Sequence, residues 1–500
     1  MKAKSILCFN LAVLMMLGTL VSCNSNTQND TSSTITSANN TSGGTENGEN
    51  MSDETARANT KDSLPADLDF DGLSVNIHSF QNEEYDIIGM GEVSGDTIYD
   101  AVYYRTLSVA ERLNVEIEWA DSATMSWSDY SSELDTVIMA GDDAWQIVYA
   151  MGNATIQKSR DNLFVDLSAP AYIDYTQPWW WNEAMSEVSF DGQERKYLVG
   201  DLALTNYLCA GAYYFNKKLY ADVFDDADEL YKIVIDGEWT LDKMRELCAD
   251  VYNDLNGNGV VDNGDLYGLI LGTAEDLKHL EFATDVQHYH RDEEGYPVIE
   301  YDLERAQLAV EKIYDLLNNT TGNILSGWYD LMPFANGQTL FHGGQLQAAL
   351  SGEFREMEDD YGIIPVPKLD ETQAEYHNLL HNASNFVAIP ITCQHIDEVC
   401  AVIEAMCAES YRTVVEPFYE SAMKMKYSRD SYSGQCIDFI RDATKKNFAY
   451  EHDGRFGSGV LISNCVEAKN TNFSSLYASS VDMSNKLIGK TVQYMKENQD

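Results

Sequence analysis

Strand and helix patterns alternate in the first third of the chain, and this alternation constrains the fold more than any other feature. Apolar and polar residues alternate over 73–77, as in a half-buried strand, and a helical pattern follows over 98–113. A second strand pattern (115–119), a second helical pattern (134–138) and a third strand pattern (146–149) complete the series. Strands separated by helices pair in parallel, so the sequence predicts an α/β fold with helices on both faces of a sheet.

Capping residues support these helix limits. Asp96 or Thr97 can cap the start of the first helix, and Asn114 can close it. Gly141 is expected to stop the second helix, and Thr240 to begin another one in the middle of the chain.

The strand pattern resumes late in the chain. Residues 215–340 and those after about 395 are mainly helical in pattern, whereas strand-like patterns return at 361–366 and 385–389. An α/β pattern that resumes after a long insertion indicates two lobes, with the chain crossing between them more than once.

The N-terminal segment predicts export and lipid attachment. Lys2 and Lys4 precede an apolar stretch over 6–20, which is too short for a permanent membrane span. Ser22 and then Cys23 follow at once, an order that resembles the bacterial lipobox, in which the cysteine receives the lipid. We therefore predict a lipoprotein signal peptide at 1–22 and an anchor at Cys23 on the extracellular face of the membrane; the alternative is a plain signal peptide with an incidental cysteine.

The segment after Cys23 is rich in Ser, Thr, Asn and Gly and nearly free of large apolar residues as far as about residue 63. Such a composition cannot bury enough apolar surface to fold. Residues 23–65 are therefore predicted to be a lipidated, disordered linker before a folded part at 66–500.

The charge balance excludes one class of partner. The 500 residues include 81 Asp and Glu against 33 Lys and Arg, which gives a formal net charge of −48. Such a surface repels phosphate backbones, so a nucleic-acid partner is excluded. A strongly anionic ligand would need a local cluster of arginines, and the sequence shows none.

The sequence from 254 to 265 has the pattern of a calcium-binding loop. Oxygen-bearing side chains occupy loop positions 1, 3, 5, 9 and 12, glycine occupies position 6, and the residue at position 7 offers its carbonyl. The predicted Ca²⁺ ligands are Asp254, Asn256, Asn258, Val260, Asp262 and Asp265. Position 12 is Asp rather than Glu, as in dockerin-type loops. The role would be structural, and the alternative is an acidic Asn-Gly turn.

Three consecutive tryptophans, Trp179, Trp180 and Trp181, stand between Pro178 and Asn182. Aromatic faces stack on the apolar faces of sugars while neighbouring amides bind hydroxyl groups. The alternative is that the rings pack between elements of the lobes, and at least one ring is expected in the core.

Other candidate motifs are weaker. The pairs His288 with His290 and His377 with His381 could bind a transition metal, although histidines in loops are commoner than ligands. Seven cysteines follow Cys23, an odd number that leaves at least one unpaired, and the seven-residue spacing of two of them favours core packing. Metalloprotease, nucleophile-elbow and dinucleotide-binding motifs in their proper context are lacking, so no catalytic residue is assigned.

Ten stretches, taken together and in order, resemble bacterial extracellular solute-binding proteins of family 1, and among these the clostridial-type lipoproteins that serve ABC importers. The stretches are Asp100 to Arg105, Arg112 to Val115, Ala140 to Trp145, Tyr172 to Asp174, Pro178 to Trp180, Tyr197 to Asp201, Tyr214 to Leu219, Gly237 to Met244, Tyr267 to Leu269 and Tyr361 to Pro367.

The resemblance implies a two-lobed periplasmic-binding-protein-like fold of type II, with a mixed sheet flanked by helices in each lobe and a cleft between the lobes. Lobe 1 would combine 66–212 with 345–410, and lobe 2 would combine 213–344 with 411–500. The chain would be a monomer that captures a small polar solute, most simply a mono- or oligosaccharide, for ABC permease subunits.

Ligand contacts in that family come from strand ends facing the cleft. Carried onto this sequence, they are Tyr149, Met151, Trp179, Trp180, Trp181, Tyr207, His342 and Asn385. The tryptophan that usually follows the third strand is absent, and Tyr149 holds the nearest position. The alternative functions are a surface-anchored glycoside hydrolase or lyase, whose paired carboxylates spacing alone does not exclude, and a sugar-sensing module.

Overall fold

A computed structural model describes residues 57–80, 85–122, 124, 126–262, 264–325, 331–419 and 431–497. Contacts group 51–500 into one unit, to which all of these residues belong. The predicted signal peptide, Cys23 and most of the predicted linker lie outside the described residues. None of the helices in the described ranges is both long and apolar enough to cross a membrane.

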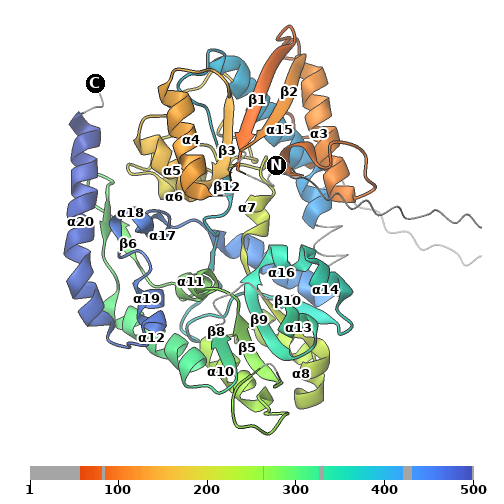
Figure 1. Ribbon diagram of the computed structural model, residues 1–500, viewed down its shortest axis with the longest axis vertical. Helices are drawn as coiled ribbons and strands as arrows, with labels where there is room; N and C mark the ends of the chain where they lie inside the picture. The colour runs from red at the N-terminus through yellow and green to blue at the C-terminus, as the bar shows by residue number, and fades with distance from the viewer. Residues whose placement is uncertain are drawn as a thin grey trace, which may run out of the picture. The chain divides into compact units, whose positions relative to one another are not determined.

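The first lobe is built on a four-stranded sheet with the order β12-β3-β1-β2, at the top of Figure 1. Its strands are β1 (Leu73–Ser79), β2 (Val115–Asp121), β3 (Ile147–Met151) and β12 (Asn385–Ala388). β1 pairs in parallel with β2 and β3, and β12 pairs antiparallel with β3. The parallel α/β pattern expected from the sequence is confirmed.

The helices of the first lobe begin and end where capping chemistry places them. The carboxylate of Asp96 accepts hydrogen bonds from the backbone N–H groups of Ile98 and Tyr99, and Asn114 ends the helix at a φ of 49°. Gly141, at a φ of 76°, follows the next helix closely. These helices are α2 (Tyr85–Ile88), α3 (Thr97–Leu113), α4 (Trp127–Met139), α5 (Gly152–Arg160), α6 (Asn182–Val188), α7 (Thr205–Leu208) and α15 (Ile396–Thr413).

The second lobe is built on a five-stranded sheet with the order β10-β4-β9-β5-β8. Its strands are β4 (Gly211–Asn216), β5 (Tyr267–Leu271), β8 (Asn323–Leu325), β9 (Thr339–Gln345) and β10 (Tyr361–Ile364). β5 pairs in parallel with β8 and β9, while β4 is antiparallel to β9 and β10. The prediction that placed 345–410 in lobe 1 was therefore wrong at its start, because β10 finds its partner in β4; an alternating pattern does not show which strand will be its neighbour.

Apolar helix faces fill the core of the second lobe. The side chain of Thr240 caps α10 as predicted, by accepting from the N–H of Lys243. Trp239, Met244 and Ile313 are among the fully buried residues of this core. The helices are α8 (Lys217–Phe224), α9 (Asp228–Ile235), α10 (Leu241–Val251), α11 (Ala274–Ala283), α12 (Leu303–Asn318), α13 (Met332–Ala335), the 3-10 helix η1 (Leu346–Leu350) and α14 (Gly352–Glu356), with a hairpin of β6 (Tyr289–Arg291) and β7 (Pro297–Ile299).

The C-terminal part of the chain touches both lobes. Its elements are α16 (Ser431–Ala443), β13 (Thr444–Lys445), α17 (Phe448–Glu451), α18 (Asp453–Phe456), α19 (Leu461–Glu467) and α20 (Phe473–Glu497). α16 packs on β10, and α19 and α20 pack on α12, so these helices lie against the second lobe. α17, by contrast, contacts α5 and α6 of the first lobe (Figure 1).

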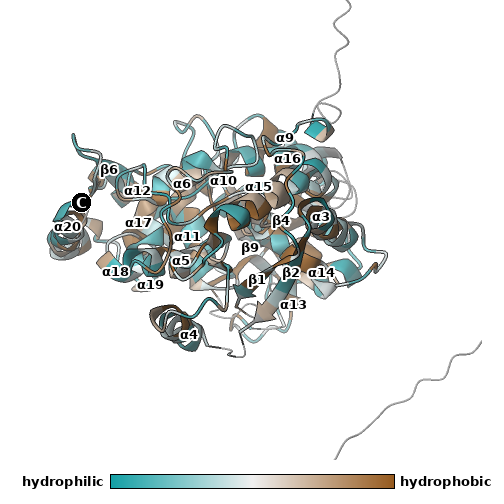
Figure 2. Ribbon diagram, turned by 90° about the horizontal axis from the view of Figure 1, so that it is seen from above, coloured by the Kyte–Doolittle hydropathy of each residue, from teal (hydrophilic) through white to brown (hydrophobic). Residues whose placement is uncertain are grey.

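The chain crosses between the two sheets three times, after β3, before β12 and after α15. Two of the crossings pair at Ala210 with Leu380, and the short strand β11 (Asn378–Leu379) pairs with β13. Three crossing segments that are distant in sequence therefore lie side by side. In Figure 2, brown apolar residues concentrate on central elements such as α15, and teal residues are common at the periphery.

The end of the predicted linker is ordered. The guanidinium of Arg57 lies 3.9 Å from the ring centroid of Tyr411, and Asp62 forms ion pairs with Arg112 (2.8 Å) and Arg412 (3.4 Å). Residues 57–65 therefore pack on the first lobe, and the linker ends earlier than predicted. Composition missed this because the partners of Arg57 and Asp62 are far away in the sequence.

Seven cysteines, all those after Cys23, are buried and unpaired with one another. Cys400 and Cys407 lie in the core of the first lobe on α15. Burial raises the pKa of the Cys400 thiol to about 12, so it stays protonated and unreactive. The expectation of core packing in place of a disulfide framework is confirmed.

Candidate ligand-binding site

The edges of both sheets that adjoin the crossing segments are edges where parallel strands end. Met151 at the end of β3 pairs with Asn385, which directly follows a crossing. Gln345 at the end of β9 pairs with Gly211, which directly follows another crossing. In open α/β sheets ligands bind beyond the carboxyl ends of strands, so a ligand site is expected near the crossings.

Asn385 is poised for binding at this edge. Its backbone N–H donates to Thr205 Oγ1 (3.2 Å), but its side-chain amide is buried with no hydrogen-bond partner among the residues that the structure describes. The hydroxyl of Ser384 is in the same situation. Buried polar groups are nearly always bonded to protein, water or ligand, so this corner demands a polar occupant. Met151 beside it is partly exposed.

Tyr149 has a different place from the one expected. Its side chain is fully buried, and its hydroxyl donates to Asp86 Oδ2 at 2.5 Å. Burial raises the pKa of Asp86, which also accepts from the backbone N–H of Thr205 (3.3 Å). Tyr149 therefore ties β3 to α2 and α7 inside the lobe and offers no surface to a ligand in this conformation.

The three tryptophans differ from one another in exposure. Trp179 is fully buried in the core of the first lobe, which fulfils the expectation that one ring packs inside. Trp180 is 5% exposed and donates through Nε1 to Glu404 Oε2 (2.9 Å). Trp181 is partly exposed and donates through Nε1 to Asp201 Oδ1 (2.9 Å).

Tyr207 shares the partner of Trp181. Its hydroxyl donates to Asp201 Oδ1 at 2.5 Å, and its ring meets that of Trp181 edge-on with centroids 5.0 Å apart. Burial raises the pKa of Asp201 to about 6, although both hydrogen bonds act in the opposite direction. The structure thus brings two of the predicted residues together around one carboxylate.

His342 lies within β9 and is 1% exposed. Its ring sits about 6 Å from those of Tyr214, Phe334 and Phe354. It lies three positions before the last residue of the strand and packs in an aromatic cluster inside the second lobe. The family-based assignment of His342 as a ligand contact stays a prediction.

A cavity of about 1050 Å³, here called the crossing cavity, lies between segments of both lobes and the crossings. Its first-lobe wall includes Trp180, Trp181 and the segment that contains α6. Its other walls include Phe282, Asp285, Val286, His288 and Arg291 of the second lobe, and the crossing segments 377–380 and 443–447. Sequence reasoning found the tryptophans but missed Asn378, whose buried side-chain oxygen has no partner within the described ranges.

Arg291 holds the α6 segment against the second lobe. Its guanidinium donates to the backbone carbonyls of Ser186, Glu187, Ser189 and Phe190 at 2.9–3.0 Å. These carbonyls stand at the negative end of α6, where the last turn lacks helical partners. A cation at that place satisfies them and fixes one wall of the crossing cavity.

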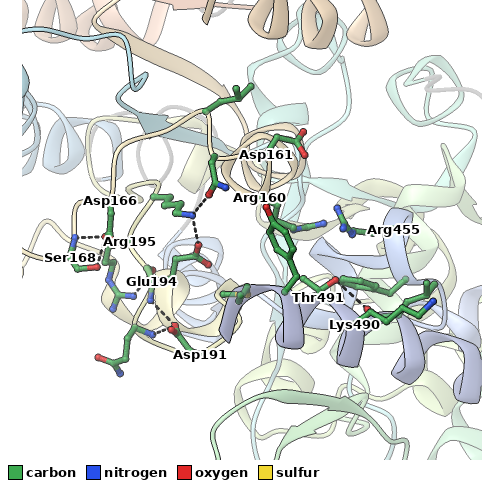
Figure 3. A pocket seen from close by; sticks show the side chains of 18 of the residues that line it. Arg160, Asp161, Asp166, Ser168, Asp191, Glu194, Arg195, Arg455, Lys490 and Thr491 are labelled. Atoms are coloured by element: carbon green, nitrogen blue, oxygen red, sulfur yellow. Dashed lines mark hydrogen bonds and ion pairs between the residues drawn. The ribbon is translucent and has the colours of Figure 1, made fainter. Parts of the chain in front are cut away.

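A second cavity, of about 1260 Å³, lies on the other side of the same segment (Figure 3). Here called the basic cavity, it is walled by α4, the end of α5, residues 161–196, α18 and α20. Asn182, Asp191 and Gln193 line both cavities. None of the predicted ligand residues lines the basic cavity.

The predicted calcium loop is folded back on itself. Asp262 accepts from the side-chain amides of Asn256 (2.8 Å) and Asn258 (2.5 Å), and Asp254 accepts from three backbone N–H groups. Asp265 is fully buried, and its Oδ1 has no partner in the described part of the chain. Val260 is 59% exposed.

The histidine pairs do not converge. His288 and His290 lie against Glu281 and Glu300, while His377 and His381 lie against Asp285 and Glu275 respectively. No cluster of three or more His, Cys, Asp or Glu side chains suited to a metal is found among the described residues. The loop at 254–265 is not a cluster of this kind. Three of its six candidate ligands are two side-chain amides and one backbone carbonyl, which are not His, Cys, Asp or Glu side chains.

Comparison with solved structures shows the fold. The chain is similar to the cyclic α-maltosyl-1,6-maltose binding protein of Arthrobacter globiformis (TM-score 0.55, 12% identity, 85% of this chain and 100% of that one). It is also similar to an ABC substrate-binding protein of Listeria monocytogenes in complex with cycloalternan (TM-score 0.53, 12% identity, 84% and 100%). A third is UgpB of Mycobacterium tuberculosis in complex with glycerophosphocholine (TM-score 0.50, 13% identity, 86% and 99%).

No protein-family model matches the sequence, and no curated protein is similar to it in sequence. The class defined by the fold is nevertheless plain. Two mixed α/β sheets flanked by helices and joined by three crossings give this chain a two-lobed fold of the periplasmic-binding-protein type.

Proposed function

We propose that this protein is the extracellular substrate-binding component of an ABC importer and that it captures a mono- or oligosaccharide by closure of its lobes. The observation that carries the proposal is the crossing cavity, which combines Trp180 and Trp181 from one lobe with Phe282 and Arg291 from the other. Its volume suits a sugar of one to a few rings. Similar structures bind oligosaccharides, which supports this ligand class.

Closure would work through the crossing segments. A ligand held by both lobes makes more contacts in the closed state than in the open one, and this difference drives the closure. Asn378, which lines the crossing cavity, would offer its side-chain oxygen to a sugar hydroxyl, since this atom lacks a partner among the described residues. The side-chain amide of Asn385, at the end of the adjoining sheet, would become a further contact in the closed state. The protein would bind without catalysis.

The proposed lipid anchor at Cys23 and the proposed extracellular location rest on the sequence of the first 23 residues. The proposed delivery to ABC permease subunits and the proposed monomeric state rest on the resemblance to family 1 solute-binding proteins. Radiolabelled palmitate incorporated into the wild type but not into Cys23→Ser would support the anchor, and equal incorporation would contradict it.

The test of the ligand proposal is a thermal-shift and calorimetric panel of neutral mono- and oligosaccharides, with peptides as a control. One sugar is expected to raise the melting temperature, since a ligand at 100 times its Kd adds about 2.7 kcal/mol to stability. Products are analysed in the same samples. Reducing ends that accumulate would indicate a glycoside hydrolase, and a panel in which only peptides bind would refute the sugar proposal.

We also propose that the loop at 254–265 binds Ca²⁺ in a structural role. Support comes from Asp265 Oδ1, which is buried without a partner in the described chain. Asn256 and Asn258, two more of the predicted ligands, already lie beside Asp262 and donate to it through their side-chain nitrogens, and rotation of these amides would turn their oxygens toward a cation. Bound Ca²⁺ would offset two of the three negative charges of Asp254, Asp262 and Asp265. A chelator is expected to lower the melting temperature of the wild type and not that of Asp254→Ala; a wild-type melt insensitive to chelator would contradict the site.

A further inference from the structure

The basic cavity has a charge balance unlike that of the whole chain. The chain carries 33 Lys and Arg against 81 Asp and Glu, whereas the lining of this cavity has five of each. The cations are Arg160, Arg195, Lys196, Arg455 and Lys490, and the carboxylates are Asp135, Asp161, Asp166, Asp191 and Glu194. The ratio of cations to carboxylates in the lining is thus more than twice the ratio in the whole chain.

Most of these carboxylates already have partners within the first lobe. Asp135 pairs with Lys158 at 2.6 Å, and Asp166 accepts from the backbone and hydroxyl of Ser168. Asp191 accepts from two backbone N–H groups, and Glu194 lies 3.4 Å from Lys196. Two of the five carboxylates are therefore neutralised by an ion pair, and two more are held by hydrogen bonds from neutral donors, so these four side chains are fixed in place.

The cations fall into two groups. Arg195 donates to the carbonyls of Gly192 and Glu194 and to Ser186 Oγ, and Lys196 is paired with Glu194. Arg160, Arg455 and Lys490, by contrast, form no ion pair with any residue that the structure describes. In Figure 3 the side chains of Arg160 and Arg455, which are 295 positions apart in the sequence, end close together.

Arg160 has hydrogen-bond donors that no described residue satisfies. Its Nη2 donates to His452 Nδ1 (2.6 Å), but its Nε and Nη1 are buried without an acceptor in the described ranges. Burial, with the charge of Arg455 added to it, lowers the pKa of Arg160 to about 10, which shows how unfavourable its surroundings are for a cation. An anion beside both guanidinium groups would offset the repulsion between their positive charges. It would also accept hydrogen bonds from the N–H groups that lack an acceptor in the described ranges.

We propose that the basic cavity is a second binding site, which takes the carboxylate or phosphate group of an anionic sugar. The planar fork of a guanidinium matches both groups in two-point hydrogen bonding. Tyr175 and Tyr494 line the same cavity and offer aromatic faces to a sugar ring. The site stands independently of the proposed function, because the crossing cavity can bind a neutral sugar whether or not the basic cavity is filled.

The site corrects an expectation from the sequence. The sequence shows no arginine cluster, and anionic ligands were disfavoured for that reason. The fold creates the cluster by bringing α18 and α20 against the end of α5. At about 0.15 M salt the Debye length is about 8 Å, so nearby arginines outweigh the diffuse negative field of the rest of the surface.

The test is calorimetric titration of the full chain, at about 0.15 M salt, with galacturonate oligomers, glucose 6-phosphate, inorganic phosphate and a neutral maltooligosaccharide. Arg455 is exposed, so Arg455→Gln is expected to fold normally, and Arg245→Gln is the matched control on an exposed face of α10. We expect the wild type and R245Q to bind an anionic sugar equally, and R455Q to bind it at least tenfold more weakly.

Each ligand and each variant in this titration tests a different part of the proposal. Binding of uronates but not of glucose 6-phosphate assigns a carboxylate ligand, and the reverse assigns a phosphate ligand. Binding of inorganic phosphate with the same affinity as the sugars overturns the sugar part of the proposal. Equal affinity of R455Q and the wild type, or no anion binding by the wild type, overturns the site, while the neutral sugar reports separately on the crossing cavity.

Discussion

The two cavities share a wall but differ in chemistry. The crossing cavity takes Trp180 and Trp181 from the segment that contains α6, and a side-chain oxygen of Asn378 that has no partner among the described residues. The basic cavity takes Glu194 and Arg195 from the same segment, together with Arg160, whose Nε and Nη1 have no acceptor within the described ranges. The first set suits a neutral polyol and the second suits an anion. The difference shows that net charge describes what a protein repels at a distance and not what a particular cavity can hold.

Substitution of Arg291 is expected to have the largest effect on stability and on ligand binding, because this side chain holds the wall that the two cavities share. Arg291→Ala leaves at least four backbone carbonyls without their donor, and we expect a loss of about 3 kcal/mol in unfolding free energy. Ligand affinity should fall at both cavities. Urea unfolding and the titrations above measure both effects.

Arg291→Lys is the matched control. It keeps the charge but lacks the fork needed to reach all four carbonyls, so we expect an intermediate loss. If the alanine variant were as stable as the wild type, the shared wall would not depend on this side chain.

Glu404 sets the pH dependence on the tryptophan side. Burial raises the pKa of Glu404 to about 7, so the folded state holds this proton more tightly than the unfolded chain does. Its contribution to stability is greatest below the ordinary pKa of 4.5 and is lost as the pH rises through 7. Glu404→Gln removes this dependence, and the stability difference between variant and wild type should shift by up to about 3 kcal/mol between pH 4.5 and pH 8.

Chemical denaturation of both proteins at the two pH values measures this shift. Asp201, whose pKa is also raised, remains in both proteins, so its effect cancels. Parallel pH profiles for the two proteins would show that Glu404 ionises normally.

Substitution of Trp181 tests whether the two cavities bind independently, because this side chain lines the crossing cavity and not the basic cavity. Trp181→Ala removes the partly exposed ring from the crossing cavity, and we expect a loss of about 1.5 to 2 kcal/mol in the binding of a neutral sugar. Binding of the anionic sugar should stay unchanged. Trp181→Phe keeps an aromatic face but not the hydrogen bond to Asp201, so it should lose less; equal losses at both cavities would mean that they are not independent.

Salt gives the smallest effect. Raising the salt concentration tenfold should weaken the binding of the anionic sugar by about 1 kcal/mol or less and leave the binding of the neutral sugar unchanged. Titrations at low and high salt compare the two. A neutral ligand with the stronger salt dependence would reverse the assignment of the cavities.

Local chemistry predicted the ends of several helices in both lobes. Asp96, Asn114 and Thr240 act as the sequence indicates, because a cap depends only on the next few residues. The segments in which apolar and polar residues alternate are strands in the structure. This could be predicted because the alternation depends on one segment alone.

Long-range pairing could not be predicted in this way. The partner of β10, the contact of Arg57 with Tyr411 and the approach of Arg160 to Arg455 all join distant segments. Tyr149 shows the same limit at a single residue. Its position at a strand end was foreseen, but the buried carboxylate of Asp86 turns its hydroxyl inward.

The anchoring of α6 by Arg291 has a consequence for motion. Residues 182–190 follow the first sheet in the chain, yet Phe190 is packed among Phe448 and Phe456, and His452 Nε2 lies 2.8 Å from the Val188 carbonyl. Ala184, Met185 and Val188 of α6 lie meanwhile in the core of the first lobe, so this stretch is bonded to both bodies. In the proposed closure of the lobes, these bonds would restrict the relative motion of the two bodies at this place, and some of them would have to break for a captured solute to leave.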